Sequence, residues 1–287
     1  MNAWHHVEDV RLDKAWSRGL VSIFCFVVDM DHHAMSMTLS NKLKCLLVPS
    51  TRVVVFTGAG ISAESGVPTF RGKDGLWREF KVQELATPEA FAANPVHVWE
   101  WYCWRIELIS KVEPNPGHLV VSWMEGFFPE FTLVTQNVDG LHDRAGNRHV
   151  LKLHGDLWEA RCVNCGKSRK RMTIPPDSLP PACECGGLLR PGVVWFGELL
   201  PQKDFSQAVS ASERCQLFFS VGTSAEVYPA AQLPMIAKES GAYVAEINIE
   251  PSALAAVADE VLIGKAGEIL PLIRQHCAPL QRERTHL

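Results

Sequence analysis

Four cysteines form the most specific pattern of chemical groups in the sequence. They occur as two close pairs, Cys162 with Cys165 and Cys183 with Cys185, separated by residues 166–182. Two such pairs of thiolates are the tetrahedral ligand set of a zinc ribbon, although the second pair has one intervening residue and not two. All four zinc positions would be filled by sulfur, which leaves none for water and predicts one structural Zn²⁺. The alternative is two reduced cysteine pairs without a metal.

A glycine-rich turn is the second chemical pattern. Residues 53–57 are β-branched or aromatic, as is typical of a buried strand, and the run Gly-Ala-Gly-Ile-Ser-Ala follows at 58–63. This run fits the G-x-G-x-x-G/A motif, whose glycines allow a tight turn and the close approach of a pyrophosphate to backbone amides. The alternative is a tight strand-to-helix turn that binds no ligand.

The region after the glycine turn differs from that of an ordinary dehydrogenase. Such an enzyme carries an acidic residue about 20 positions further on, at the end of a second strand, to bind the ribose. Here residues 70–77 have the composition of a loop, and Asp74 follows no apolar strand. Pro68 also ends the first helix early. The sequence therefore predicts a dinucleotide site that does not serve simple hydride transfer.

Length, charge and cysteine number indicate a globular protein from a reducing compartment. The chain has 287 residues and is 47% hydrophobic, enough to bury the core of one large domain with insertions or of two domains. A net charge of −4 does not favour nonspecific binding to nucleic acid. Nine cysteines, an odd number, indicate a reducing compartment and not a disulfide framework.

Residues 1–45 form an extension of uncertain order. The apolar run at residues 20–28 is too short to span a bilayer, which takes roughly 20 residues. Glu8, Asp9 and Asp13 precede it, and no clear cleavage site follows, which argues against a signal or transit peptide. We expect a cytoplasmic protein with no membrane partner and no direct nucleic-acid partner.

The chemical groups must be positioned by a sheet. Apolar, β-branched runs that predict strands occur at residues 53–57, 131–135, 150–155, 215–222, 243–248 and 257–263. Their alternation with helical segments predicts an α/β fold with a parallel sheet of Rossmann type and a smaller module made of the zinc ribbon and a helical insert. Ligands bind at the carboxyl ends of such strands, where Gln136, Asn137 and Asp139 follow the second strand. The alternative role for these three side chains is loop capping.

Four runs, taken in order, resemble the sirtuins, the NAD-dependent protein deacylases: residues 58–62, 69–72, 135–142 and 153–155. The resemblance extends from about Val53 to about Ile273. It implies that NAD is a consumed co-substrate and that the products are free lysine, nicotinamide and 2′-O-acyl-ADP-ribose. It also implies acyl-lysine protein substrates bound as an extended strand. Rival interpretations are a mono-ADP-ribosyltransferase on the same scaffold and a catalytically idle NAD or ADP-ribose sensor.

The resemblance also assigns site residues. His154 corresponds to the catalytic histidine, whose ordinary pKa near neutrality suits a general base, and Asn137 corresponds to a residue that holds the nicotinamide. A lone histidine at a strand end would otherwise be structural, as we expect of His118. Contacts with NAD are implied for Gly58, Ala59, Gly60, Ser62, Thr69, Phe70, Arg71, Trp77, Gln136, Asn137, Asp139, Gly222, Thr223, Ser224, Asn248, Ile249, Glu250 and Ala266.

The acyl pocket is predicted on a helix. Thr87 and Asn94, each followed by proline, are predicted helix starts, and Tyr102 and Arg105 lie three residues apart on one helix face. Alone, this pair would be a core aromatic and a solvated arginine. Tyr-x-x-Arg resembles the sirtuin class that removes acidic acyl groups, because a guanidinium binds a carboxylate through two hydrogen bonds. We therefore expect succinyl or malonyl, with acetyl also accepted. Further substrate contacts are implied for Ala86, Val193, Val194, Phe196, Val227 and Tyr228.

These expectations divide the chain into parts. They are an extension (1–45), a discontinuous Rossmann-like NAD-binding domain (46–70, 116–155 and 197–276), a helical insert with the acyl pocket (71–115), a zinc-binding module (156–196) and a tail (277–287).

Overall fold

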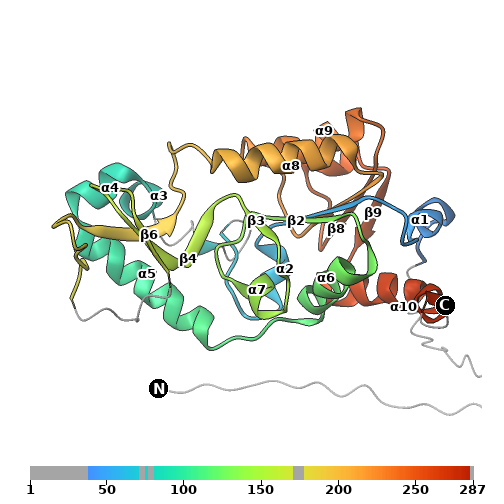
Figure 1. Cartoon of the computed structure of the whole chain (residues 1–287), viewed down its shortest axis with the longest axis horizontal. Helices are drawn as coiled ribbons and strands as arrows, with labels where there is room; N and C mark the ends of the chain where they lie inside the picture. The colour runs from blue at the N-terminus through green and yellow to red at the C-terminus, as the bar shows by residue number, and fades with distance from the viewer. Residues whose placement is uncertain (1–37, 71–74, 77–80, 171–177, 285–287) are drawn as a thin grey trace, which may run out of the picture. The chain divides into compact units, whose positions relative to one another are not determined.

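The computed structural model describes residues 38–70, 75–76, 81–170 and 178–284 (Figure 1). Its main element is a parallel six-stranded sheet. The strands are β1 (Val53–Thr57), β2 (Phe131–Thr135), β3 (Val150–Lys152), β7 (Leu217–Val221), β8 (Tyr243–Asn248) and β9 (Glu260–Ile263). Their order is β3-β2-β1-β7-β8-β9, and all five pairings are parallel. This is the predicted Rossmann-type sheet.

Both faces of the sheet are covered, which explains the continuous apolar strands. Every residue of β1 and of β7 is buried, as expected for central strands with helices on both sides. Helices α8 (Gln202–Arg214) and α9 (Leu233–Glu239) lie on one face, and α6 (Pro116–Phe127), α7 (Leu141–Arg144) and α10 (Ala266–Arg284) lie on the other (Figure 1). Because the strand order reverses between β1 and β7, a ligand crevice is expected where these two strands end.

A smaller module joins an antiparallel sheet to three helices. The sheet contains β4 (Gly155–Cys162), β5 (Ser168–Lys170) and β6 (Leu189–Val193), in the order β5-β4-β6. The helices are α3 (Val82–Leu85), α4 (Pro88–Ala93) and α5 (Pro95–Ser110). Trp99 on α5 is buried against β6, and its indole Nε1–H donates to the Leu189 carbonyl at 2.8 Å. The fold class is therefore the predicted one, while the domain boundaries stay predictions.

Two helix starts confirm local sequence signals. The Thr87 hydroxyl accepts from the Ala90 amide, and Pro88 is the first residue of α4. The Asn94 side-chain oxygen accepts from the His97 amide at the start of α5. Capping of this kind depends on only a few neighbouring residues, so it can be read from sequence.

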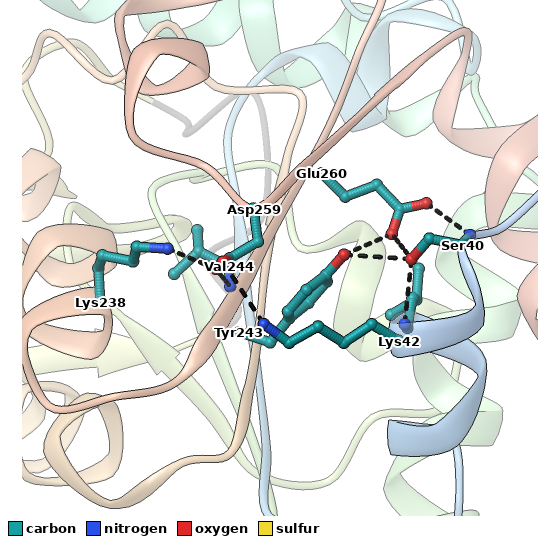
Figure 2. A network of polar contacts seen from close by, with 8 residues as sticks. Ser40, Lys42, Lys238, Tyr243, Val244, Asp259 and Glu260 are labelled. Carbon is teal, nitrogen blue, oxygen red and sulfur yellow. Dashed lines mark hydrogen bonds and ion pairs between the residues drawn. The ribbon is translucent and has the colours of Figure 1, made fainter.

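The first helix is fastened to the far edge of the large sheet (Figure 2). Ser40 caps α1 (Asn41–Leu46): its hydroxyl accepts from the Leu43 amide and donates to Glu260 Oε2 at 2.6 Å. The Ser40 amide donates to Glu260 Oε1, and the Tyr243 hydroxyl donates to Glu260 Oε2. Leu39 and Leu43 are buried. Residues 38–45, predicted as part of an extension of uncertain order, therefore belong to the folded body.

The last helix is longer than expected. The sequence predicts a tail from residue 277, whereas α10 continues to Arg284 with Pro271 and Pro279 inside it. Cys277 is fully buried and its thiol contacts the Leu47 carbonyl, so tertiary packing holds this part of the helix in place. Within the described residues, no helix is both long and apolar enough to be a membrane span.

Candidate active site

A cavity of about 980 Å³ lies where the strands of the large sheet end. It is also bordered by α5 and by the segment that follows β6. The predicted site residues that line it are Gly58, Ala59, Gly60, Thr69, Phe70, Ala86, Tyr102, Arg105, Gln136, Asn137, His154, Val193, Val194, Phe196, Gly222, Thr223, Ser224, Val227, Tyr228, Asn248, Ile249, Glu250 and Ala266. The structure thus brings cofactor-side and substrate-side predictions into one cavity. Arg71 and Trp77, also predicted to contact NAD, lie outside the described residues.

Two glycine loops that line the cavity pack against each other through their backbones. The Gly60 amide donates to the Gly222 carbonyl at 2.8 Å, and the Gly58 amide donates to the Val221 carbonyl at 2.9 Å. A Cβ on Gly58 would lie 2.7 Å from the Gly222 carbonyl oxygen. Gly222 has φ +60°, and a Cβ there would lie 2.5 Å from the Ile61 amide nitrogen. The glycines are therefore required by the contact between the two loops, and all three line the cavity.

Polar side chains behind the first glycine loop hold Asn137. Its side-chain NH₂ donates to the Gly58 carbonyl at 3.0 Å and to the Ser62 hydroxyl at 3.2 Å. The Ser62 hydroxyl donates to Asp139 Oδ2 at 2.7 Å, and the Leu141 amide donates to Asp139 Oδ1. Because the NH₂ is committed to the loop, the Asn137 side-chain oxygen remains to accept a hydrogen bond from a ligand in the cavity.

Ser62 and Asp139 differ from the sequence expectation. We predicted that both contact NAD, but neither lines the cavity, and both are buried behind the glycine loop. Burial raises the pKa of Asp139, while hydrogen bonds from Leu141 and Ser62 oppose this shift. In this structure the two residues fix the position of Asn137.

His154 has the protonation form that a general base needs. Its Nδ1 lies 3.0 Å from the Gln136 carbonyl oxygen. A carbonyl can only accept, so Nδ1 carries the proton and Nε2 keeps its lone pair. Burial lowers the pKa of His154, which favours the neutral ring. The backbone on either side is tied down, because the Leu153 amide donates to Thr135 and the Val194 amide donates to the His154 carbonyl.

The arginine of the predicted acyl pocket is buried beside two aromatic rings. Arg105 is 4% exposed, and its guanidinium carbon lies 4.4 Å from the centre of the Phe70 ring and 5.1 Å from that of Trp101. Within the described residues no carboxylate forms an ion pair with it, although the Asp139 carboxylate attracts it from further away and opposes the lowering of its pKa by burial. Burial lowers the pKa of Arg105 to about 10, so the group is still charged at pH 7. A buried cation that borders a cavity is a site for an anion.

Tyr102 and Trp195 lie beside this arginine. The Tyr102 hydroxyl accepts a hydrogen bond from Trp195 Nε1 at 2.9 Å, and burial raises the pKa of Tyr102 to about 12. We did not predict a role for Trp195. Residues 193–196 are all apolar in the sequence, so no local pattern distinguishes Trp195 from its neighbours. In the structure Val193 and Trp195 are buried while Phe196 is 45% exposed.

The segment predicted to bind the substrate peptide already uses several of its amides. The Val194 and Phe196 amides donate to the His154 and Ala86 carbonyls. The Trp195 amide donates to Glu198 Oε2 at 2.8 Å. A peptide strand beside this segment therefore cannot pair with these three N–H groups.

The four cysteines form a cluster of the right size for zinc. All four sulfur atoms lie within 4.8 Å of one another, with Cys162 to Cys185 at 3.5 Å and Cys165 to Cys183 at 3.8 Å. Tetrahedral zinc with bonds of about 2.3 Å places its sulfurs about 3.8 Å apart. The donor set therefore fits a structural zinc. None of the four lines the cavity, so the zinc would stabilise the small sheet and take no part in chemistry.

Comparisons with known proteins agree with this geometry. The model of the Sir2 family matches residues 58–229. The NAD-dependent protein deacylase of Aquifex aeolicus is 59% identical over 208 residues, which are 72% of this chain and 87% of that protein. NAD-dependent protein deacylase 2 of Pyrobaculum aerophilum is 54% identical over 84% of this chain and 97% of that protein.

Solved structures are also similar. A Sir2 homologue in complex with NAD has a TM-score of 0.77 at 46% identity, covering 85% of this chain and 96% of that one. A complex of Sir2 with a p53 peptide and NAD⁺ has a TM-score of 0.74 at 30% identity, covering 84% of this chain and 99% of that one. On the family model and the identity of these relatives, this chain belongs to the Sir2 family, the sirtuins.

Proposed function

We propose that this sirtuin removes acidic acyl groups, succinyl and malonyl, from protein lysines in an NAD-dependent reaction, and that it also accepts acetyl. The general activity is that named for its relatives, NAD-dependent protein deacylation. The preference for acidic groups is supported by one observation: Arg105 is a buried cation that borders the cavity and forms no ion pair with a carboxylate of the described residues.

An acyl group that ends in a carboxylate should bind beside Arg105 more tightly than a neutral acyl group. Charge-assisted hydrogen bonds contribute roughly 1.5–3 kcal/mol each, more than neutral ones. A succinyl or malonyl carboxylate would accept from the Arg105 guanidinium and from the Tyr102 hydroxyl. An acetyl group would leave the buried guanidinium unpaired. Ala86 leaves space on the wall of the same pocket.

The remaining residues have roles that follow from their hydrogen bonds. The bare backbone of the glycine loops accommodates the pyrophosphate, and the Asn137 side-chain oxygen accepts from the nicotinamide amide. When bound, NAD would supply the ribose whose 2′ oxygen takes the acyl group, with nicotinamide as the leaving group. Water completes the release of free lysine, so that the products are nicotinamide, free lysine and 2′-O-acyl-ADP-ribose. His154 accepts a ribose hydroxyl proton at Nε2, while its Nδ1–H stays on Gln136.

The test is deacylation of one peptide carrying succinyl-lysine or acetyl-lysine, followed by mass spectrometry with and without NAD. We expect NAD-dependent loss of both groups, with succinyl removed more efficiently. Arg105→Met should lower kcat/KM for succinyl relative to acetyl by about tenfold to a hundredfold, the loss of a charge-assisted hydrogen bond. Arg148→Met, the same change at an exposed position outside the cavity, is the control.

Two outcomes would contradict the proposal. Removal of acetyl but not of succinyl would support deacylation and contradict the preference for acidic acyl groups. Nicotinamide release with both acyl groups left intact would indicate ADP-ribosyl transfer.

A further inference from the structure

The contact between Trp195 and Tyr102 determines where the phenol hydrogen points. The indole Nε1–H donates to the Tyr102 oxygen at 2.9 Å, and both side chains are 3% exposed. An indole nitrogen can only donate, whereas a phenol has one hydrogen to give and two lone pairs to accept with. The Tyr102 hydrogen is therefore directed away from Trp195. Among the described residues it has no acceptor, and Tyr102 lines the cavity beside Arg105.

The indole itself is held rigidly from several sides. The Arg190 guanidinium carbon lies 3.4 Å from the centre of the Trp195 ring. Glu198 forms an ion pair with Arg190 and also accepts from the Trp195 amide, so one carboxylate fixes both residues. The Phe91 ring packs against the indole, with ring centres 5.5 Å apart. With its ring and its backbone both fixed, Trp195 presents its N–H in one direction only.

We propose that Trp195 is a positioning residue for recognition of the acyl carboxylate. By occupying a lone pair of Tyr102, it commits the Tyr102 hydrogen to the cavity, where the carboxylate accepts it alongside the Arg105 guanidinium. This inference rests on the proposed preference for acidic acyl groups. Trp195 touches no reacting atom and acts only through Tyr102.

Residues 194–196 take part both in the predicted contacts with the substrate peptide and in the proposed recognition of the acyl carboxylate. Trp195 lies between Val194 and Phe196, two of the residues predicted to contact the acyl-lysine, and all three line the cavity. The direction of the Tyr102 hydroxyl therefore depends on the same backbone that borders the substrate.

The first experiment compares two removals of a buried indole N–H. Trp195→Phe keeps an aromatic ring but deletes the donor to Tyr102. Trp99→Phe deletes an equivalent donor, bonded to the Leu189 carbonyl at 2.8 Å, from the same hydrophobic cluster. Trp99 does not line the cavity. We expect Trp195→Phe to lower the ratio of desuccinylation to deacetylation efficiency by about tenfold, the effect of about one hydrogen bond, and Trp99→Phe to leave that ratio unchanged.

The second experiment tests whether Trp195 acts through Tyr102. Tyr102→Phe removes the hydroxyl, and the double variant Trp195→Phe with Tyr102→Phe should have the same ratio as Tyr102→Phe alone. Effects that multiply would overturn the proposal, as would an unchanged ratio in Trp195→Phe.

A third measurement does not depend on acyl preference. In a ¹⁵N spectrum of the protein, which has nine tryptophans, Trp195→Phe identifies the Trp195 indole resonance. That resonance should move in Tyr102→Phe because its acceptor is lost, and a fixed resonance would show that the hydrogen bond is absent. If the resonance moves but the wild-type enzyme does not remove succinyl, the contact exists and the proposed function is what fails.

Discussion

At the scale of single residues, His154 is kept in one tautomer by a backbone carbonyl. The Gln136 carbonyl fixes the proton on Nδ1, and burial favours the neutral ring, so the lone pair on Nε2 is ready before substrate binds. The hydrogen bond to Gln136 and the lowered pKa of His154 therefore both favour the neutral ring with its proton on Nδ1.

This arrangement predicts how the rate depends on pH and on His154. Because the pKa is lowered below its ordinary value of about 6.5, kcat/KM should stay level down to that pH and fall only at lower pH, where the ring gains a proton. His154→Ala should lower kcat/KM by about a hundredfold or more while NAD binding, measured by calorimetry, is retained. His149→Ala, at an exposed histidine, is the control. Full activity of His154→Ala would reject the general-base role.

At the scale of secondary structure, the small sheet that carries the zinc ribbon also forms one wall of the cavity. The second cysteine pair leads into β6, and β6 pairs with β4. Val193 ends β6, and Trp195 follows two residues later. Apolar residues of β4 and β6 pack in one cluster with those of α5, and structural zinc can add folding free energy at the cysteine end of the small sheet.

We therefore expect one zinc per chain by elemental analysis. Cys165→Ser should lower the zinc content and the melting temperature and should reduce deacylation, because β6 and the segment after it lose their support. Cys45→Ser changes an exposed cysteine on α1, outside the cluster, and should leave all three quantities unchanged. Normal activity in a zinc-free Cys165→Ser protein would contradict this account.

Local and nonlocal features differ in how well the sequence predicts them. The starts of α4 and α5 follow from Thr87 and Asn94, since a cap bonds to amides two or three residues away. The strands follow from apolar runs, and the cysteine cluster follows from spacing. The placement of Ser62 and Asp139 behind the loop, and the contact of Trp195 with Tyr102, depend on segments far apart in sequence. No local pattern specifies such contacts.

At the scale of the whole molecule, two buried histidines link stability to pH. His118 and His142 are both 2% exposed or less, with ring centres 5.0 Å apart. Burial lowers the pKa of His118 to about 2 and that of His142 to about 4. In the unfolded chain each would take up a proton near pH 6.5. The stability that depends on their neutral forms is therefore complete above this pH and is lost as pH falls below it.

The free energy of unfolding should decrease between pH 6.5 and 4.5 by at most about 1.4 kcal/mol per pH unit for each of the two histidines. Urea unfolding at several pH values measures this slope. His118→Asn should reduce the slope, although it will also alter stability at pH 7. His97→Asn, at an exposed histidine, should not change it. A slope identical in wild type and His118→Asn would mean that His118 is not buried in its neutral form.

The contact between the two glycine loops also restricts how the protein can evolve. Residues 58–60 and residue 222 are far apart in the chain, yet a methyl group added at Gly58, Gly60 or Gly222 would meet backbone atoms of the opposite loop. Backbone cannot change rotamer to make room, so no later substitution of a neighbouring side chain can compensate. Directed-evolution libraries therefore gain nothing by sampling these three positions.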